Sequence, residues 1–115
     1  MTRPQAVPEL EEERIDELTP LFNVVLLDDD QHTYDYVIEM LQRLFLISAQ
    51  QAFRHAEEVD TTGRTIVLTC ELPAAEFARD QIHGYGPDIR MPESKGSMSA
   101  IIEPAGAPGN PAGLR

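Results

Sequence analysis

The chain has 115 residues, 42% of them hydrophobic, which leaves room for one domain with a modest core. Its formal net charge of −11 argues against binding to nucleic acid, whose phosphates require clusters of Lys and Arg, and against anionic membrane surfaces. Cys70 is the only cysteine, which excludes an intramolecular disulfide, and the absence of a signal segment or a run of about 18 apolar residues predicts a soluble, cytoplasmic protein.

Both ends of the chain differ in composition from its middle. Residues 1–20 are acidic and poor in apolar side chains, and residues 104–115 (PAGAPGNPAGLR) are rich in Pro, Gly and Ala. Such segments bury too little apolar surface to offset the entropy lost on ordering. We therefore predict a disordered acidic N-terminal extension over 1–20, one domain over 21–103 and a flexible C-terminal tail over 104–115.

The first half of the domain predicts one strand and two helices. Residues 22–27 (FNVVLL) are an apolar run of strand-forming residues, typical of a buried central strand. Thr33 is suited to cap the next helix. The apolar residues of that helix recur at helical spacing: Val37, Ile38, Leu41, Leu44 and Phe45. Ser48 and Gln51 form a capping box for a second helix, which ends before Thr62 and Gly63. The residues of this helix expected to face inward are Ala52, Phe53, Ala56 and Val59.

The second half predicts a strand, a helix and a last strand. Residues 64–70 (RTIVLTC) read as a strand, and Pro73 suits the first turn of a helix that ends at Gly84. This helix is expected to run through Ala75, Phe77, Ala78 and Ile82. Residues 97–103 (SMSAIIE) are the last predicted strand. The order β-α-α-β-α-β predicts an α+β domain, with a small sheet and its helices on one face.

Three consecutive aspartates, Asp28, Asp29 and Asp30, follow the first strand, where their carboxylates repel one another. Aspartates are common in turns because they accept hydrogen bonds from free N–H groups, so a solvated turn is one interpretation. A cation-binding site is the other. The acidic turn and His32 lack the spacing and glycine of an EF-hand and the paired Cys and His ligands of a zinc site. No cofactor is expected, and an acidic metal-binding regulator remains the weakest of the alternatives.

Enzymatic catalysis is not indicated by any motif in the chain. A glycine-rich phosphate loop, a Cys–His signature and a nucleophile elbow are all missing from the sequence. His32, His55 and His83 fall on three different elements, and each is expected at the surface or a helix end. We therefore predict a binding protein and no enzyme.

Three stretches carry a resemblance to a known family. They are LLDDDQHTYDYVIEMLQRLF, AQQAFRHAEEVDTTGRTIVLT and AEFARDQIHGYG, in this order along the chain. Over about residues 20–103 the sequence resembles the ClpS family, the adaptors of Clp-type AAA+ proteases. The resemblance implies an α+β fold with a three-stranded antiparallel sheet and three helices.

The resemblance also gives the aspartates a function. ClpS proteins bind the N-terminal residue of substrates that begin with Phe, Tyr, Trp or Leu, called N-degrons, and deliver these substrates to a Clp unfoldase. A free α-amino group has a pKa of about 8 and presents three donors when protonated. Carboxylates at the end of a strand can accept them in charge-assisted hydrogen bonds, while an apolar hollow between the two helices holds the first side chain.

Carried over by position, the resemblance assigns residues to each task. The α-ammonium group is expected to meet Asp28, Asp29, Asp60 and His32. The side-chain pocket is expected to comprise Tyr34, Val37, Ile38, Ala56 and Val59. The partners implied are N-degron peptides or proteins and the N-domain of a ClpA- or ClpC-like AAA+ unfoldase, which would dock on Glu76 and Arg79 and engage the N-terminal extension. Neither nucleic acid nor a membrane is an expected partner.

The chain departs from the family pattern at four positions. Asp60 stands where the family commonly has His, Ala56 stands at a pocket position that is often Met, and Tyr34 replaces a rim Met. Arg79 lies one place away from the usual Lys, about 100° around the helix. The pocket changes predict an altered first-residue preference that tolerates large aromatic side chains. The alternative is a ClpS-like interaction domain that has lost recognition of N-termini.

Overall fold

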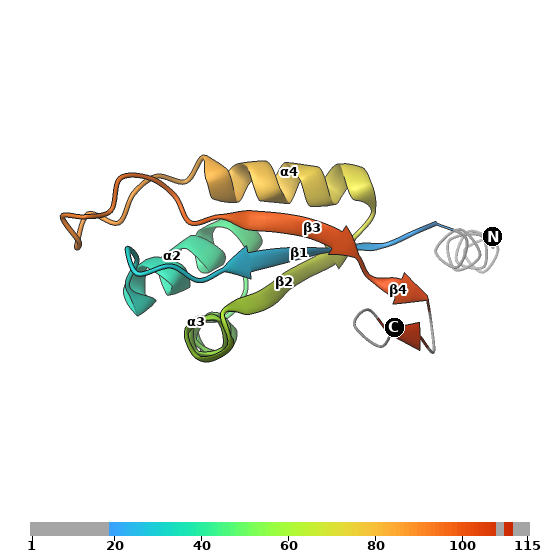
Figure 1. Ribbon diagram of the computed structural model, residues 1–115, viewed down its shortest axis with the longest axis horizontal. Helices are drawn as coiled ribbons and strands as arrows, with labels where there is room; N and C mark the ends of the chain where they lie inside the picture. The colour runs from blue at the N-terminus through green and yellow to red at the C-terminus, as the bar shows by residue number, and fades with distance from the viewer. Residues whose placement is uncertain (1–18, 108–109, 112–115) are drawn as a thin grey trace, which may run out of the picture.

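The computed structural model describes residues 19–107 and 110–111 of the chain (Figure 1). The main elements are β1 (Phe22–Leu27), α2 (Tyr34–Phe45), α3 (Ala49–Thr62), β2 (Arg64–Cys70), α4 (Leu72–His83) and β3 (Ala100–Pro104). The strands β4 (Gly106–Ala107) and β5 (Asn110–Pro111) form a separate two-stranded ladder. The predicted α+β order is confirmed. Most of the predicted N-terminal extension lies outside the described residues, and the domain limits 1–20, 21–103 and 104–115 stay a prediction.

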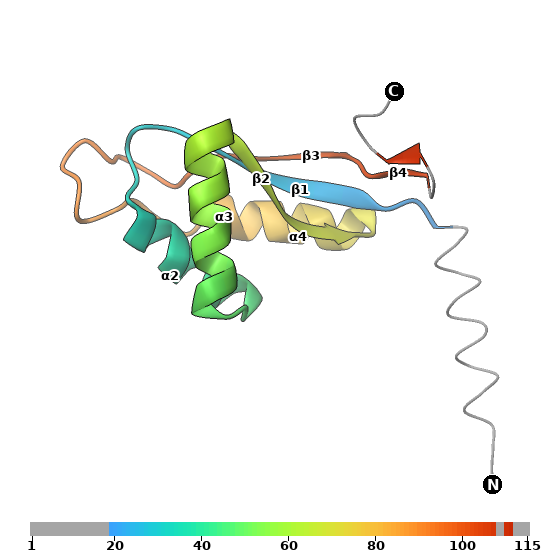
Figure 2. The same cartoon turned by 90° about the horizontal axis from the view of Figure 1, so that it is seen from below.

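The sheet has the order β2-β1-β3, and both strand pairs are antiparallel. As predicted, β1 is the central strand. Val24 and Leu26 point into the core that the helices cover, whereas Ile66 and Ile101, the cross-strand neighbours of Val25, remain exposed. The helices accordingly lie on one face of the sheet, as the view in Figure 2 shows. Among the described residues, no helix has both the length and the apolar character needed to cross a membrane.

The helix limits follow from local hydrogen bonds that the sequence predicts. Thr33 caps α2 by accepting from the Tyr36 N–H, and Ser48 and Gln51 form both bonds of the capping box of α3. Gly63 ends α3 at a φ of 92°, a left-handed conformation that costs glycine nothing because it has no Cβ. The chain therefore turns sharply from α3 into β2, and this turn lies beside the end of β1.

Two details differ from the prediction. The last strand begins at Ala100, because Ser97 instead accepts a hydrogen bond from the Gly86 N–H (2.6 Å) and Met98 turns into the interior. Phe53 was expected to face inward but is 45% exposed, and Phe77 on α4 is 66% exposed. The buried stripes of α3 and α4 consist mainly of alanine, so these helices pack closely, and the two phenylalanines lie beside the stripes on the outer surface.

A buried carboxylate, Asp88, connects the long loop before β3 to the start of α2. It accepts hydrogen bonds from the N–H (2.7 Å) and the hydroxyl (2.8 Å) of Thr33 and from the N–H (3.0 Å) and guanidinium (3.2 Å) of Arg90. Burial alone would raise the pKa of Asp88, but these four bonds favour the ionised form and hold the pKa below its ordinary value. The carboxylate thus fixes the cap residue that directly precedes Tyr34.

We expect Asp88→Ala to destabilise the domain by about 1–3 kcal/mol, because the donors of Thr33 and Arg90 lose a buried acceptor. Since the pKa of Asp88 is lowered in the folded state, its contribution is fully present above the ordinary carboxyl pKa of about 3.9 and is lost as the pH falls through the folded pKa. Urea unfolding at several pH values measures both effects. Asp30→Asn, at an exposed carboxylate, is the control, and equal losses in the two variants would contradict the assignment.

Candidate functional site

Three segments of the chain converge where β1 ends. The Leu27 N–H donates to the carbonyl of Ser99 (3.0 Å), and the Asp28 N–H donates to the carbonyl of Gly63 (3.0 Å). The acidic turn is therefore fixed on one side to the segment that enters β3 and on the other to the end of α3. Asp60, one turn before Gly63, is brought to the same place as the aspartates that follow β1.

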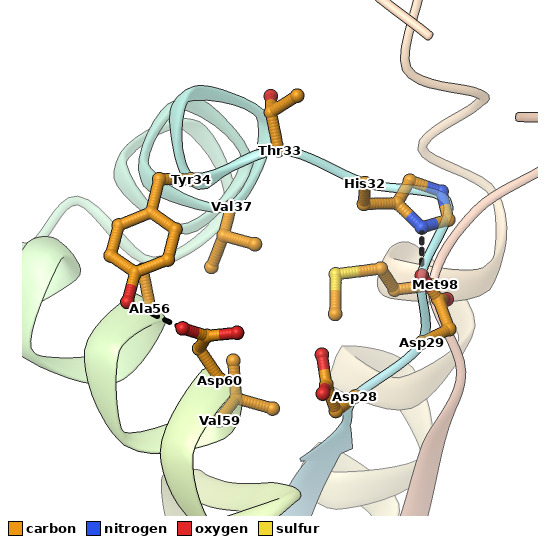
Figure 3. Close-up of a pocket in the computed structure, with 10 residues that line it drawn as sticks. All are labelled: Asp28, Asp29, His32, Thr33, Tyr34, Val37, Ala56, Val59, Asp60 and Met98. Carbon is orange, nitrogen blue, oxygen red and sulfur yellow. Dashed lines mark hydrogen bonds and ion pairs between the residues drawn. The ribbon is translucent and has the colours of Figure 1, made fainter. Parts of the chain in front are cut away.

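A hollow opens at this junction between α2, α3 and the acidic turn (Figure 3). Its empty volume is about 290 Å³, a figure that includes space open to the solvent. Its walls are apolar and buried, whereas its rim carries carboxylates and a phenol. The lining residues are Asp28, Asp29, His32, Thr33, Tyr34, Val37, Ala56, Val59, Asp60 and Met98.

The structure brings together all the residues predicted for the α-ammonium group and the side-chain pocket except one. Ile38 does not line the hollow and packs against the core, because it lies about 100° around α2 from Val37. The sequence reading missed Met98, which forms a wall of the hollow. The only sequence feature that marks Met98 is its apolar side chain between two serines. The preceding loop is long, so the sequence does not show where Met98 lies relative to the hollow. The binding roles of all these residues remain predictions.

The carboxylates of Asp28, directly after β1, and of Asp60, on α3, face the same space (Figure 3). Partial burial raises the pKa of Asp28, and the negative charges of Asp60, Asp29 and Asp30 raise it further, against the effect of a hydrogen bond from the Asp29 N–H. Mutual repulsion of this kind is relieved by a cation. The hollow is therefore an acidic cup with an apolar floor, and its lining contains neither Lys nor Arg.

His32 holds Asp29 in place. Its Nδ1 lies 2.7 Å from Oδ1 of Asp29, and its Nε2 lies 2.7 Å from the carbonyl oxygen of Gly96. The imidazole is only 2% exposed and packs against the ring of Tyr36 at 4.4 Å between centroids. The Gln31 N–H also donates to Oδ1 of Asp29 (2.9 Å). Both bonds use the same carboxylate oxygen, and no other described residue donates a hydrogen bond to Oδ2.

Two of the departures from the family pattern contact each other across the rim. The Tyr34 hydroxyl donates to Oδ2 of Asp60 (2.9 Å), as the dashed line in Figure 3 shows. This hydrogen bond raises the pKa of Tyr34, as do partial burial and the charges of Asp60, Glu57 and Asp28. The enlarged side chain at position 34 and the acidic side chain at position 60 therefore form one unit.

The residues predicted to meet the unfoldase lie elsewhere. Glu76 and Arg79 are on α4, which runs along the β3 edge of the sheet, whereas α3 lies by β2 (Figure 1). Nε of Arg79 is 3.1 Å from Oδ1 of Asp80 in an exposed ion pair. Neither residue lines the hollow, so the hollow and this surface of α4 are separate.

The two remaining histidines make structural contacts. Nδ1 of His55 lies 2.8 Å from the hydroxyl of Thr65, and burial lowers the pKa of this histidine. Nε2 of His83, in the last turn of α4, lies 3.1 Å from both the N and the O of Ala100 in β3. Within residues 19–107 and 110–111, no three His, Cys, Asp or Glu side chains are arranged to hold a metal ion.

Comparison with known proteins identifies the family. Residues 17–92 match the family model described as ATP-dependent Clp protease adaptor protein ClpS. The chain is 31% identical over 88 residues to the adapter ClpS of Synechococcus elongatus, with 76% of this chain and 81% of the relative covered. It is 33% identical over 84 residues to the adapter ClpS of Vibrio atlanticus, with 72% and 79% covered.

A solved structure shows the same fold. Agrobacterium tumefaciens ClpS2, determined with L-phenylalaninamide bound, superposes with a TM-score of 0.63 at 25% identity, and the match covers 74% of this chain and 96% of that one. The fold and the acidic hollow thus define a ClpS-type domain. The chain belongs to the ClpS family of Clp protease adaptors. The expected family and the expected adaptor function are confirmed at this level, and an adaptor is a binding partner of a protease and not itself a protease.

Because Asp60 is both the hydrogen-bond acceptor of the Tyr34 hydroxyl and its nearest negative charge, we expect Asp60→Asn to lower the pKa of Tyr34 toward the ordinary tyrosine value. Titration of the tyrosine ring signals by NMR follows this residue separately from Tyr36 and Tyr85. Asp35→Asn, on the outer surface of the first turn of α2, should leave the titration of Tyr34 nearly unchanged. An unaltered Tyr34 titration in Asp60→Asn would show that the rim contact does not form in solution.

Proposed function

We propose that this protein captures the N-terminal residue of its substrates in the acidic hollow and passes these substrates to a Clp unfoldase. One observation carries the proposal: the carboxylates of Asp28, Asp29 and Asp60 line the same hollow as buried apolar side chains. That combination complements two features that an N-terminal residue carries on the same Cα atom, a protonated amine and a side chain.

In this proposal the α-ammonium group binds among the three carboxylates. Its three N–H donors match three acceptors that have no Lys or Arg beside them in the hollow. His32 acts as a positioning residue, since both of its ring nitrogens are already bonded to Asp29 and Gly96. An internal peptide segment, or an acetylated N-terminus, has no charged amine to offset the desolvation of these carboxylates.

The first side chain of the substrate packs in the apolar part of the hollow. Val37 and Val59 supply rigid walls, Ala56 leaves room where the family often has Met, and Met98 supplies a flexible wall that adapts to different shapes. Phenylalaninamide, found in the Agrobacterium relative, is a small molecule with a free amine and an aromatic side chain. These features support bulky hydrophobic first residues (Phe, Tyr, Trp and Leu) with tolerance for the large aromatic ones.

Delivery of the substrate requires a second surface. We assign docking of a ClpA- or ClpC-like N-domain to the outer face of α4 with Glu76 and Arg79, which leaves the hollow accessible. Binding and release break no covalent bond, so the proposed action is not enzymatic. The cytoplasmic location expected from the sequence stays a prediction. The alternative of lost recognition is not favoured, because Ala56 and Asp60, its main support, both line the hollow.

Binding should depend on a free N-terminus and on the first side chain. We expect fluorescent peptides that begin with Phe, Tyr, Trp or Leu to bind more tightly than peptides that begin with Ala or Gly, and N-acetylation to abolish binding. Asp29→Ala should weaken binding by about 1.5–3 kcal/mol, because the ammonium loses a charged acceptor. Fluorescence anisotropy measures both effects.

Asp80→Ala, at an exposed carboxylate on α4, is the matched control for loss of one negative charge and should bind as the wild type does. Equal affinity for free and acetylated peptides, or for Phe and Gly starts, would contradict capture of N-termini. It would leave a ClpS-like interaction domain as the better description.

Peptide affinity should also vary with pH through Asp28. A bound ammonium favours the ionised carboxylate, so binding lowers the pKa of Asp28, which is raised in the free protein. Affinity should therefore increase as the pH rises through that pKa, and decrease again as the peptide amine loses its proton near pH 8, about its own pKa. Asp28→Asn should flatten the acidic limb and keep the alkaline one. Calorimetric binding curves across pH test this, and an acidic limb unchanged in Asp28→Asn would assign it to another group.

A further inference from the structure

An exposed pair of aromatic rings continues the rim of the hollow outward. The rings of Tyr34 and Phe53 lie 5.8 Å apart between centroids at an angle of 58°. Phe53 is exposed on α3, outside the core and outside the hollow, whereas Tyr34 belongs to the rim. Single exposed apolar residues are common on protein surfaces, but here two rings form one surface that begins at the binding site. We call Tyr34 and Phe53 the aromatic shelf.

Negative charge surrounds the aromatic shelf. Glu57 is four residues after Phe53 on α3, so the two side chains are neighbours on one face of the helix. Asp60, one turn further, accepts the hydrogen bond from Tyr34. Glu57 is close enough for its charge to act on the Tyr34 phenol. The shelf thus combines ring faces, which attract cations, with two carboxylates.

From this arrangement we propose that the aromatic shelf, with Glu57 and Asp60, is a subsite for the second residue of the substrate and prefers Lys or Arg there. The inference rests on the proposed capture of N-termini in the hollow. Because consecutive Cα atoms are about 3.8 Å apart, a peptide with its first side chain in the hollow places its second residue at the rim. Tyr34, which belongs to both surfaces, is the wall that the first and second residues share.

The chemistry of the shelf selects a long basic side chain over the alternatives. The methylene stem of Lys or Arg packs on the rings while its charged end reaches Glu57. A Glu or Asp at the second position meets the charges of Asp60 and Glu57 and is repelled. An Ala there gains neither contact. Since the shelf is solvent-exposed, the expected preference is modest, about three- to tenfold for Lys over Ala, and it should decrease as salt is added.

The test uses the full chain and three peptides that begin with Phe, carry Lys, Ala or Glu at the second position, and are otherwise identical and labelled at the C-terminus. Anisotropy should give the affinity order Lys, Ala, Glu for the wild type. Phe53→Ser and Glu57→Gln should each reduce the differences in affinity among the three peptides. Neither variant should change the dependence on a free amine. Phe77→Ser removes a phenylalanine of α4 that is exposed as well, 66% against 45% for Phe53, and is the matched control, which should keep the wild-type order.

The outcomes separate this inference from the function on which it rests. Equal affinities for the three peptides in the wild type, with retained dependence on a free amine and a bulky first residue, would overturn the second subsite alone. A preference for Lys that persists in both Phe53→Ser and Glu57→Gln would overturn it as well, because general attraction by the acidic protein would then explain the order. Loss of all dependence on the free amine in the wild type would overturn the capture of N-termini itself.

Discussion

Two backbone hydrogen bonds at the end of β1 determine where everything else in the site lies. The bond from Leu27 to Ser99 fixes the approach to β3, and the bond from Asp28 to Gly63 fixes the end of α3. With these contacts in place, residues that are far apart in sequence line one hollow, Asp28 at one end and Met98 at the other. The central position of β1 in the sheet makes this possible, because a strand with neighbours on both sides has a rigid end.

Repulsion among the carboxylates of the acidic rim destabilises the free protein locally, and the surrounding structure offsets this effect. Partial burial and the neighbouring carboxylates raise the pKa of Asp28 above its ordinary value, so its negative charge is unfavourable in the free protein. The domain offsets this elsewhere, through the fully bonded Asp88 that holds the start of α2 and the buried His32 that holds Asp29. Such conflicts between neighbouring groups are typical of functional sites, where unfavourable charge in the free state becomes favourable contact with a ligand.

Particular residues show which parts of the fold and of the site can be predicted from the sequence. The capping box at Ser48, the cap at Thr33 and the turn at Gly63 are local signals. The first two set the helix starts correctly, and the third gave the end of α3 to within one residue. The acidic turn by itself left a solvated turn and a cation-binding site open, and the resemblance to the ClpS family is what favoured the binding site. Met98 and Asp88 could not be placed, since their positions depend on the path of a long loop and on contacts with distant residues. Phe53 was misplaced because helical periodicity alone does not give the width of a buried stripe.

The hydrogen bond between Tyr34 and Asp60 explains two departures from the family pattern together. Taken one at a time, each departure would be expected to weaken binding in the hollow. A rim methionine replaced by tyrosine could block the hollow, and a histidine replaced by aspartate removes an imidazole contact. Together they keep a polar partner at position 60 and anchor the larger ring beside it. The same bond holds the Tyr34 ring against Phe53 and keeps a carboxylate at the edge of the aromatic shelf. In our proposal, a hollow reshaped in this way extends its selection for positive charge from the amine of the first residue to the side chain of the second.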